Sequence, residues 1–270
     1  MGRNVLLLIL LVGLVGGCAS SMSVSSRVER EPTVYAGVYG EDLVWSGQVT
    51  MDGDVLILEN ARLTILPGTE VLVTPAEGTQ IDPEYLSSLT ELLVRGRLDI
   101  QGSAAEPVRF VAANSVFGED YAWAGIILDQ AGESRIVHAE IVRAETAIRT
   151  VSCSPLIEGN LISHCRYGIV TQQQSHPKVL DNTIRNGEGG LFCWGGSNPY
   201  LKGNRIIDHD EEGVFVDAGS RPWLDRNTIS GNSIGLAIYP RDLPFDPFAI
   251  SNNRQDVRFL GSQGLAGEDP

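Results

Sequence analysis

The sequence is poor in basic residues. Of its 270 residues only 20 are Lys or Arg, against 34 Asp or Glu, and the formal net charge at pH 7 is -14. Binding to a nucleic acid needs a basic face, so this balance argues against nucleic acid as a partner. The hydrophobic fraction of 43% and the charged fraction of 20% are those of a globular domain with a sizeable core.

Long apolar runs are also scarce, and the one at the N-terminus is too short to span a bilayer. It extends from Val5 to Val15, follows Arg3, and is typical of a secretory signal. The stretch "VGGC" that ends at Cys18 resembles the lipobox of bacterial lipoproteins. The resemblance implies cleavage before Cys18 and a lipid on its sulfur and its new amino group. With Ala19 next, it also implies the outer membrane. An ordinary secretory signal is the alternative.

Cysteine is limited to four residues. With Cys18 acylated, Cys153, Cys165 and Cys193 remain. One disulfide among them could form in an oxidising compartment, but their positions do not fix the pair. Their spacing matches no zinc-binding pattern.

Glycine, by contrast, is abundant at 30 residues and takes part in a repeat of about 22 residues. Each unit carries a proline, then an asparagine, then an isoleucine, and closes with a glycine. The clearest units hold Pro155, Pro177, Pro199 and Pro222, then Asn160, Asn182, Asn204 and Asn227, then Gly168, Gly190, Gly213 and Gly235. A weaker copy precedes these units, and a degenerate copy follows them.

Each unit contains three short apolar pieces that alternate with period two, which predicts strands rather than helices. After each glycine the inward positions are predicted to be Ile169, Thr171, Leu191, Cys193, Val214, Val216, Leu236 and Ile238. One unit cannot bury these side chains alone, so stacked units with parallel strands are expected, which is a solenoid. The asparagines are predicted to adopt a left-handed turn and to hydrogen-bond along the stack.

These units, with "GDVLILENARLTILPGTEVLV" (Gly53 to Val73), resemble the right-handed parallel β-helix repeats of the pectate-lyase-like superfamily. The resemblance implies an all-β, single-stranded right-handed parallel β-helix. The expected organisation is a signal peptide (1–17), a lipidated tether (18–34), the β-helix (35–260) and a C-terminal tail (261–270). A short helix from Asp82-Pro83 is predicted within residues 76–91, and a covering loop at residues 239–250.

Stacking places equivalent positions one strand spacing apart, so Glu188 and Glu211 should be neighbours. Together with Arg166 they are candidates for an acid/base pair, because retaining glycosidases hold two carboxyl groups close together. Asp208 and Asp210, with Glu211, are the alternative candidates for a Ca²⁺ site. A solvated turn with no chemical role is the third interpretation.

A second set of columns faces outward on the strands after the glycines. The candidate ligand-binding residues there are Phe192, Trp194, Phe215, Asp217 and Tyr239. Exposed aromatic side chains in a row are unusual on a soluble surface. They are expected to stack on sugar rings or to form a protein interface, unless the loop at 239–250 covers them. Tyr200 and Trp223 form a second, smaller aromatic patch.

The fold itself does not name a function, because β-helices of this kind include lyases, hydrolases, binding modules and adhesins. Related hydrolases use several aspartates on outward strand positions, and only Asp217 occupies such a position here, which argues against catalysis. The sequence therefore favours an envelope lipoprotein, attached to the membrane by its lipid. Its β-helix would be a non-catalytic scaffold for a polysaccharide or an envelope protein. The alternatives are a carbohydrate-active enzyme and a structural part of an envelope assembly.

Overall fold

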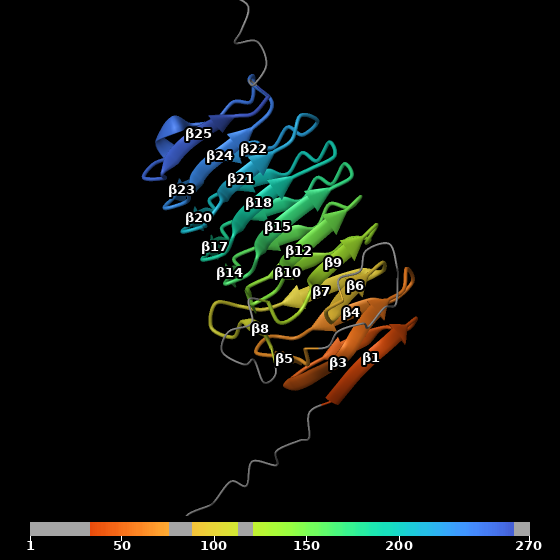
Figure 1. Cartoon of the computed structure of the whole chain (residues 1–270). Coiled ribbons are helices and arrows are strands. Elements are labelled where there is room, and N and C mark those ends of the chain that lie inside the picture. Colours follow the sequence, from red (N-terminus) through yellow and green to blue (C-terminus); the bar gives the residue numbers. More distant parts are fainter. Residues whose placement is uncertain (1–32, 76–87, 113–120, 262–270) are drawn as a thin grey trace, which may run out of the picture. The chain divides into compact units, whose positions relative to one another are not determined.

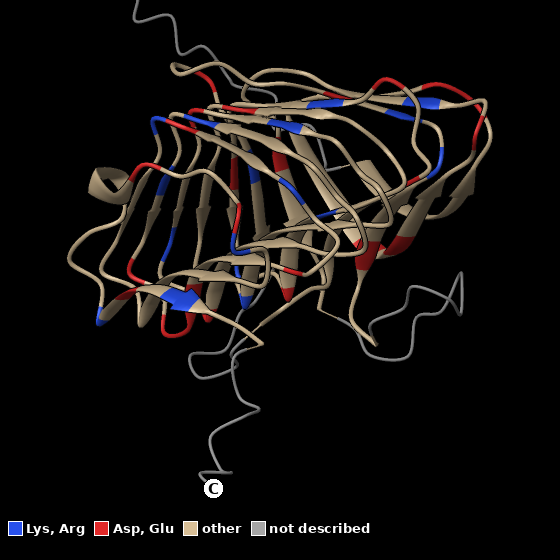
Figure 2. Cartoon of the chain, turned by 90° about the horizontal axis from the view of Figure 1, so that it is seen from above, with Lys and Arg blue, Asp and Glu red and all other residues tan. Residues whose placement is uncertain are grey.

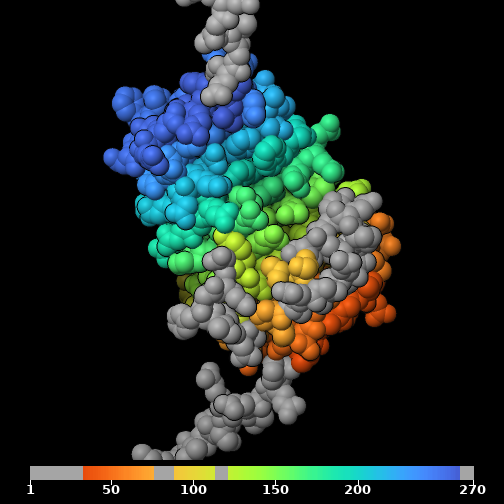
Figure 3. All heavy atoms as spheres, in the orientation of Figure 1, coloured from red at the N-terminus to blue at the C-terminus, as the bar shows by residue number. Residues whose placement is uncertain are grey.

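The computed structural model describes residues 33–75, 88–112 and 121–261, which wind into a parallel β-solenoid of about nine turns (Figure 1). The turns follow one another as bands of colour from orange to blue in the space-filling view (Figure 3). Strands pair in parallel with their equivalents in the next turn, as β13 does with β16. The prediction of an all-β parallel β-helix with a repeat of about 22 residues is confirmed.

The strands of the solenoid lie on three faces. The first face holds the strands that follow the repeat prolines and the equivalent strands of the earlier turns: β2 (Leu43–Trp45), β4 (Arg62–Ile65), β7 (Arg97–Gln101), β10 (Arg135–Val137), β13 (Leu156–Glu158), β16 (Lys178–Leu180), β19 (Tyr200–Lys202) and β22 (Trp223–Asp225). The second face holds the strands that follow the repeat asparagines and the equivalent strands of the earlier turns: β5 (Glu70–Val73), β8 (Val108–Ala112), β11 (Ala139–Val142), β14 (Leu161–Ser163), β17 (Thr183–Arg185), β20 (Arg205–Ile207) and β23 (Thr228–Ser230).

The third face holds the strands around the repeat glycines: β6 (Glu91–Val94), β9 (Gly125–Asp129), β12 (Thr146–Val151), β15 (Tyr167–Gln172), β18 (Gly189–Cys193), β21 (Glu212–Val216), β24 (Ile234–Ile238) and β25 (Gln255–Phe259). The first strands, β1 (Thr33–Tyr39) and β3 (Gln48–Ile57), are longer than most. β3 pairs with β5 through its first half and with β6 through its second half, so it joins the second and third faces.

The core runs along the axis of the stack and is built from the inward residues of all three faces. All eight positions predicted to face inward after the glycines are fully buried. Trp123 and Phe110 fill the earlier turns, where their rings stack with centroids 5.7 Å apart. Acidic and basic residues are interspersed along the strands and turns (Figure 2). None of the helices in the described ranges is long and apolar enough to cross a membrane.

The repeat asparagines form the predicted ladder along the stack. Asn182 Nδ2 donates to Asn204 Oδ1 at 3.0 Å, and Asn204 Nδ2 donates to Asn227 Oδ1 at 2.9 Å. The prediction that the asparagines themselves are left-handed is wrong. The left-handed residue is the one before each asparagine, as at Asp181 with a φ of 53° and Arg226 with a φ of 51°. That residue turns the chain, and the asparagine side chain then points into the stack.

Several smaller predictions also have an outcome. The segment 239–250 lies at the C-terminal end of the stack as expected, where Leu243 and Ile250 join the core and η1 (Pro247–Ala249) forms a single 3-10 turn. β1 begins at Thr33, slightly before the expected start of the domain. The helix predicted from Asp82 lies outside the described residues. Cys153, Cys165 and Cys193 are all buried and form no disulfide with one another.

Candidate functional site

The acidic turn "DHDEEG" connects β20 to β21 and is one residue longer than its neighbours in the stack. After the extra residue the two turns pair again residue by residue: Asp210 N donates to Gly187 O at 2.9 Å, and Glu211 N donates to Glu188 O at 2.7 Å. Asp208, Asp210 and Glu211 are exposed to solvent. The structure therefore does bring the backbones of Glu188 and Glu211 together, as the repeat predicts.

His209, at the centre of this turn, faces into the stack rather than toward its acidic neighbours. Its backbone N donates to Asn232 Oδ1 at 3.0 Å, and its Nε2 lies 3.3 Å from Ile184 O. Burial lowers the pKa of this imidazole below its ordinary value, which favours the neutral form at pH 7. His209 thus occupies the inward corner position that Asn232 holds in the next turn.

The carboxylate of Glu188 is bound by residues of earlier turns. Arg166 Nε donates to Glu188 Oε2 at 2.9 Å, and the Tyr121 hydroxyl donates to Glu188 Oε1 at 2.8 Å. Arg166 Nη1 also lies 3.9 Å from Glu145 Oε1, and the guanidinium of Arg166 lies over the ring of Tyr167. These contacts direct Glu188 away from the Glu211 side of the stack.

Glu211 has neither a hydrogen bond nor an ion pair to its carboxylate within the described ranges. Burial, followed by the charge of Glu211, raises the pKa of the adjacent Glu212 above its ordinary value. Among the residues that the structure describes, no cluster of three or more His, Cys, Asp or Glu side chains could hold a metal ion. The predicted Ca²⁺ ligands Asp208, Asp210 and Glu211 therefore lie on one exposed turn without converging on a common point.

The aromatic side chains of the third face form a continuous row of ring contacts. Trp194 stacks on Phe215 with ring centroids 4.4 Å apart, and Phe215 stacks on Phe192 at 5.7 Å. Tyr167 and Tyr239 meet the two ends of this group edge-on, at 5.0 Å from Phe192 and 6.2 Å from Phe215. We call these five residues the aromatic row. Phe192 is nearly buried, whereas Trp194 is 40% exposed and Tyr239 is 43% exposed.

A hollow of about 290 Å³ lies beside the aromatic row. Its lining comes from three neighbouring strands of the third face and consists of Thr146, Arg149, Tyr167, Val170, Gln172, Phe192 and Trp194. Arg149 Nη2 donates to Thr146 Oγ1 at 3.3 Å, while Arg149 Nε is buried with no hydrogen-bond partner. A positive charge thus lies at one side of the hollow and aromatic rings at the other.

Asp217, one of the predicted ligand-binding residues, accepts hydrogen bonds from the backbone with both carboxylate oxygens. Its Oδ2 accepts a hydrogen bond from Gly195 N at 2.6 Å, and its Oδ1 accepts one from Gly219 N at 3.1 Å. Because both oxygens bind backbone, Asp217 fixes the turn that follows Trp194. It thereby supports the aromatic row.

The segment 239–250 does not cover the exposed part of the aromatic row. Its residues Phe245 to Ile250 lie beside Leu224, Arg226, Asn227 and Ile229, which belong to the first and second faces. The segment closes the last turn and leaves Trp194 and Tyr239 accessible.

The comparison with known families decides the classification. A family described as right handed beta helix region matches residues 119–255. The chain belongs to this family. Neither a search of curated proteins nor a search of solved structures found a match. The family is defined by its fold, so it names no substrate or partner for this β-helix.

Sequence reasoning missed several residues of the β-helix that lie at or near the hollow. Arg149 lies in a turn where the repeat is weakly marked, and Tyr167 lies in a well-marked turn directly before the repeat glycine Gly168. Glu91 is fully buried, and its backbone N donates to Asp54 Oδ1 at 3.0 Å. Burial, and then the charge of Asp54, raises the pKa of Glu91 to about 8, while Arg149 lowers it. A charged residue inside the apolar strand "ELLV" was the only signal available.

The second aromatic patch is on the first face. Trp223 is 65% exposed, and the hydroxyl of its register partner Tyr200 donates to Asp225 Oδ2 at 3.2 Å. The residues therefore lie side by side as predicted.

Proposed function

We propose that this β-helix is a non-catalytic glycan-binding protein of the cell envelope, and that the glycan lies along the aromatic row of the third face. The observation that carries the proposal is the stacked pair Trp194–Phe215, half exposed beside a hollow of about 290 Å³. Flat apolar rings next to polar groups suit the apolar faces and hydroxyl edges of sugar rings. Exposed aromatic side chains gathered in this way are otherwise unfavourable in water.

The residues that line the hollow indicate which class of glycan it would bind. Arg149 has no carboxylate partner within the described ranges, and its guanidinium faces the hollow from β12. Glu91, its acidic neighbour, has a pKa raised to about 8 and is therefore mostly uncharged at pH 7. A guanidinium can bind a carboxylate with two parallel hydrogen bonds. The proposed ligand is therefore a glycan with acidic sugars.

Binding to a panel of acidic and neutral glycans, followed by calorimetry with the best ligand, tests the proposal. Trp194→Ala should weaken binding at least about tenfold, because truncation of a central aromatic residue commonly costs more than 1.4 kcal/mol. Trp223→Ala is the matched control, since it removes an exposed tryptophan from the first face. Binding to none of the glycans, or an equal loss in both variants, contradicts the proposal.

We also propose that the chain is anchored to the outer membrane through a lipid on Cys18. This proposal rests on the N-terminal sequence, where "VGGC" closes an apolar run. In cells fed labelled palmitate, the wild-type chain should take up the label and fractionate with membranes. Cys18→Ala should take up none and lose its membrane association. If Cys18→Ala still takes up the label, the proposal of a lipid on Cys18 is wrong. The proposal of a glycan site is not affected by that result.

A further inference from the structure

Two arginines lie side by side on the first face, away from the aromatic row. Arg62 on β4 and Arg97 on β7 are register partners, so their backbones are one strand spacing, about 4.8 Å, apart. Both side chains are exposed, and within the described ranges neither forms an ion pair. Like charges directly opposite each other on neighbouring strands destabilise a sheet. A negative charge beside the two guanidinium groups would therefore offset their repulsion.

Other arginines of these early turns do hold a carboxylate. Arg95 Nε lies 3.0 Å from Asp129 Oδ2, and Arg109 Nε lies 2.8 Å from Glu140 Oε2. Arg135, which follows Arg97 on the same face, pairs with Asp99. Arg62 and Arg97 differ from these three although the chain carries an excess of acidic residues.

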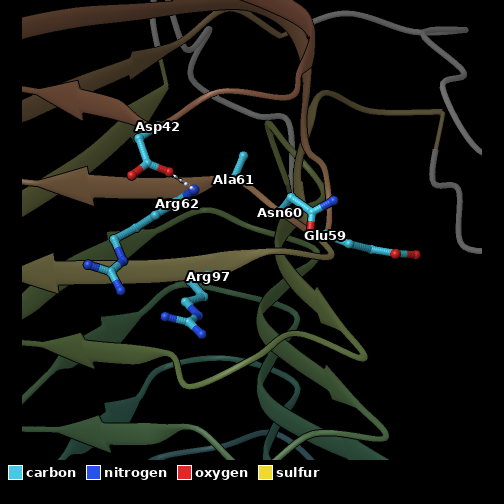
Figure 4. Close-up of a pocket in the computed structure, with 6 residues that line it drawn as sticks. All are labelled: Asp42, Glu59, Asn60, Ala61, Arg62 and Arg97. Atoms are coloured by element: carbon cyan, nitrogen blue, oxygen red, sulfur yellow. Dashed lines mark hydrogen bonds between the residues drawn. The ribbon is translucent and has the colours of Figure 1, made fainter.

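The two arginines line a pocket of about 310 Å³ at the edge of the first face, together with Asp42, Glu59, Asn60 and Ala61 (Figure 4). Figure 4 shows both guanidinium groups on the same side of the pocket and the Glu59 carboxylate turned away from them. Asp42 Oδ1 accepts a hydrogen bond from the backbone N of Arg62 at 2.8 Å. Neither carboxylate of the pocket therefore lies within ion-pair distance of a guanidinium.

We propose that this pocket binds a tetrahedral oxyanion, phosphate or sulfate, either as the free ion or as the end group of a larger molecule. Each guanidinium presents several N–H donors in a planar fork, and two forks together can satisfy the oxygens of such an ion. Asn60 also lines the pocket. The pocket has the volume of about ten water molecules, which leaves room for the group that carries the oxyanion.

Calorimetric titration of the purified full-length chain with sodium phosphate, sodium sulfate and glycerol phosphate, at constant ionic strength in chloride, tests the proposal. Saturable binding at one site is expected for phosphate or sulfate. Arg97→Gln and Arg62→Gln should each weaken it at least about tenfold, the loss expected for hydrogen bonds to a charged group. Asp42→Asn should tighten it several-fold, because the asparagine oxygen still accepts from Arg62 N while a negative charge leaves the pocket.

The matched control is Arg205→Gln, which removes an exposed arginine from β20 on the second face and changes the net charge equally. It should leave the affinity unchanged. Tighter binding of glycerol phosphate than of inorganic phosphate supports the proposal and identifies an end group, and the reverse order supports it with the free ion as ligand. The proposal is overturned if neither ion saturates a site by ~10 mM, or if Arg205→Gln weakens binding as much as Arg97→Gln.

Discussion

Glu91 and Asp54 lie next to each other on neighbouring strands, β6 and β3, and both carboxyl groups are buried. Neither oxygen of the Glu91 side chain has a hydrogen-bond partner. A buried carboxylate without partners is costly, and a second one beside it repels it, so Glu91 keeps its proton. This is the physical cause of its pKa of about 8.

The raised pKa of Glu91 should make the free energy of unfolding depend on pH. Between the ordinary pKa of 4.5 and about 8, folded Glu91 holds a proton that the unfolded chain has lost. The free energy of unfolding should therefore fall as the pH rises through this window, by up to about 1.4 kcal/mol per pH unit, and level off above pH 8. Glu91→Gln should remove this contribution, so its stability relative to wild type should increase from pH 5 to pH 8 in urea unfolding.

Glu41→Gln, which removes an exposed carboxylate near the same end of the stack, is the control for any loss of negative charge. A constant difference in unfolding free energy between Glu91→Gln and wild type, from pH 5 to pH 8, would show that Glu91 titrates alike in both states.

At the scale of the element, the repeat glycines determine how closely neighbouring strands of the third face approach. A Cβ on Gly190 would overlap the carbonyl oxygen of Gly213 and Cγ2 of Ile206. The glycine therefore allows β18 and β21 to lie at their normal spacing where the chain turns into the strand. The same arrangement recurs at Gly168 and Gly213, so the column of glycines is a packing requirement rather than a turn requirement.

Gly190→Ala should therefore destabilise the fold by about 2 kcal/mol or more, because backbone of β21 has to move. Gly219→Ala is the control: the atoms nearest to its Cβ would be 3.4 Å away or farther, and its cost should stay within about 0.5 kcal/mol. The two unfolding free energies can be compared in urea. An equal cost at both positions would contradict the packing role of Gly190.

At the scale of the whole molecule, the three buried cysteines report on the opening of the stack. They lie in successive turns, and burial raises the pKa of Cys153 to about 11 and those of Cys165 and Cys193 to about 12. Only the thiolate reacts readily, and all three cysteines are buried while the turns are stacked.

A thiol reagent such as dithionitrobenzoate should therefore leave all three cysteines unreacted in the native state and modify all three in denaturant. If the stack opens cooperatively, the three should react together in partial denaturant, as mass spectrometry would show. Rapid reaction of one cysteine in native buffer would mean that its turn opens locally.

The fold was predictable because the repeat is regular from Pro155 onward. The recurring proline, asparagine and glycine fix the register even where one turn is a residue longer, so the columns Phe192–Phe215 and Glu188–Glu211 could be read directly from the sequence. The sequence does not show that Asp181 rather than Asn182 is the left-handed residue, because both residue types favour turns and only the backbone separates them.

The sequence by itself determined the solenoid, the inward and outward positions, and the asparagine ladder, since these depend on period and on residue type. The tertiary structure alone decided which side chains meet. Tyr121 reaches Glu188 from far away in the chain, and Arg62 meets Arg97 across an insertion that breaks the repeat. Such contacts depend on variable loop lengths and on side-chain direction, which periodicity does not encode. For that reason only the structure shows that the acidic residues of "DHDEEG" lie on an exposed turn, and that a hollow lies beside Trp194.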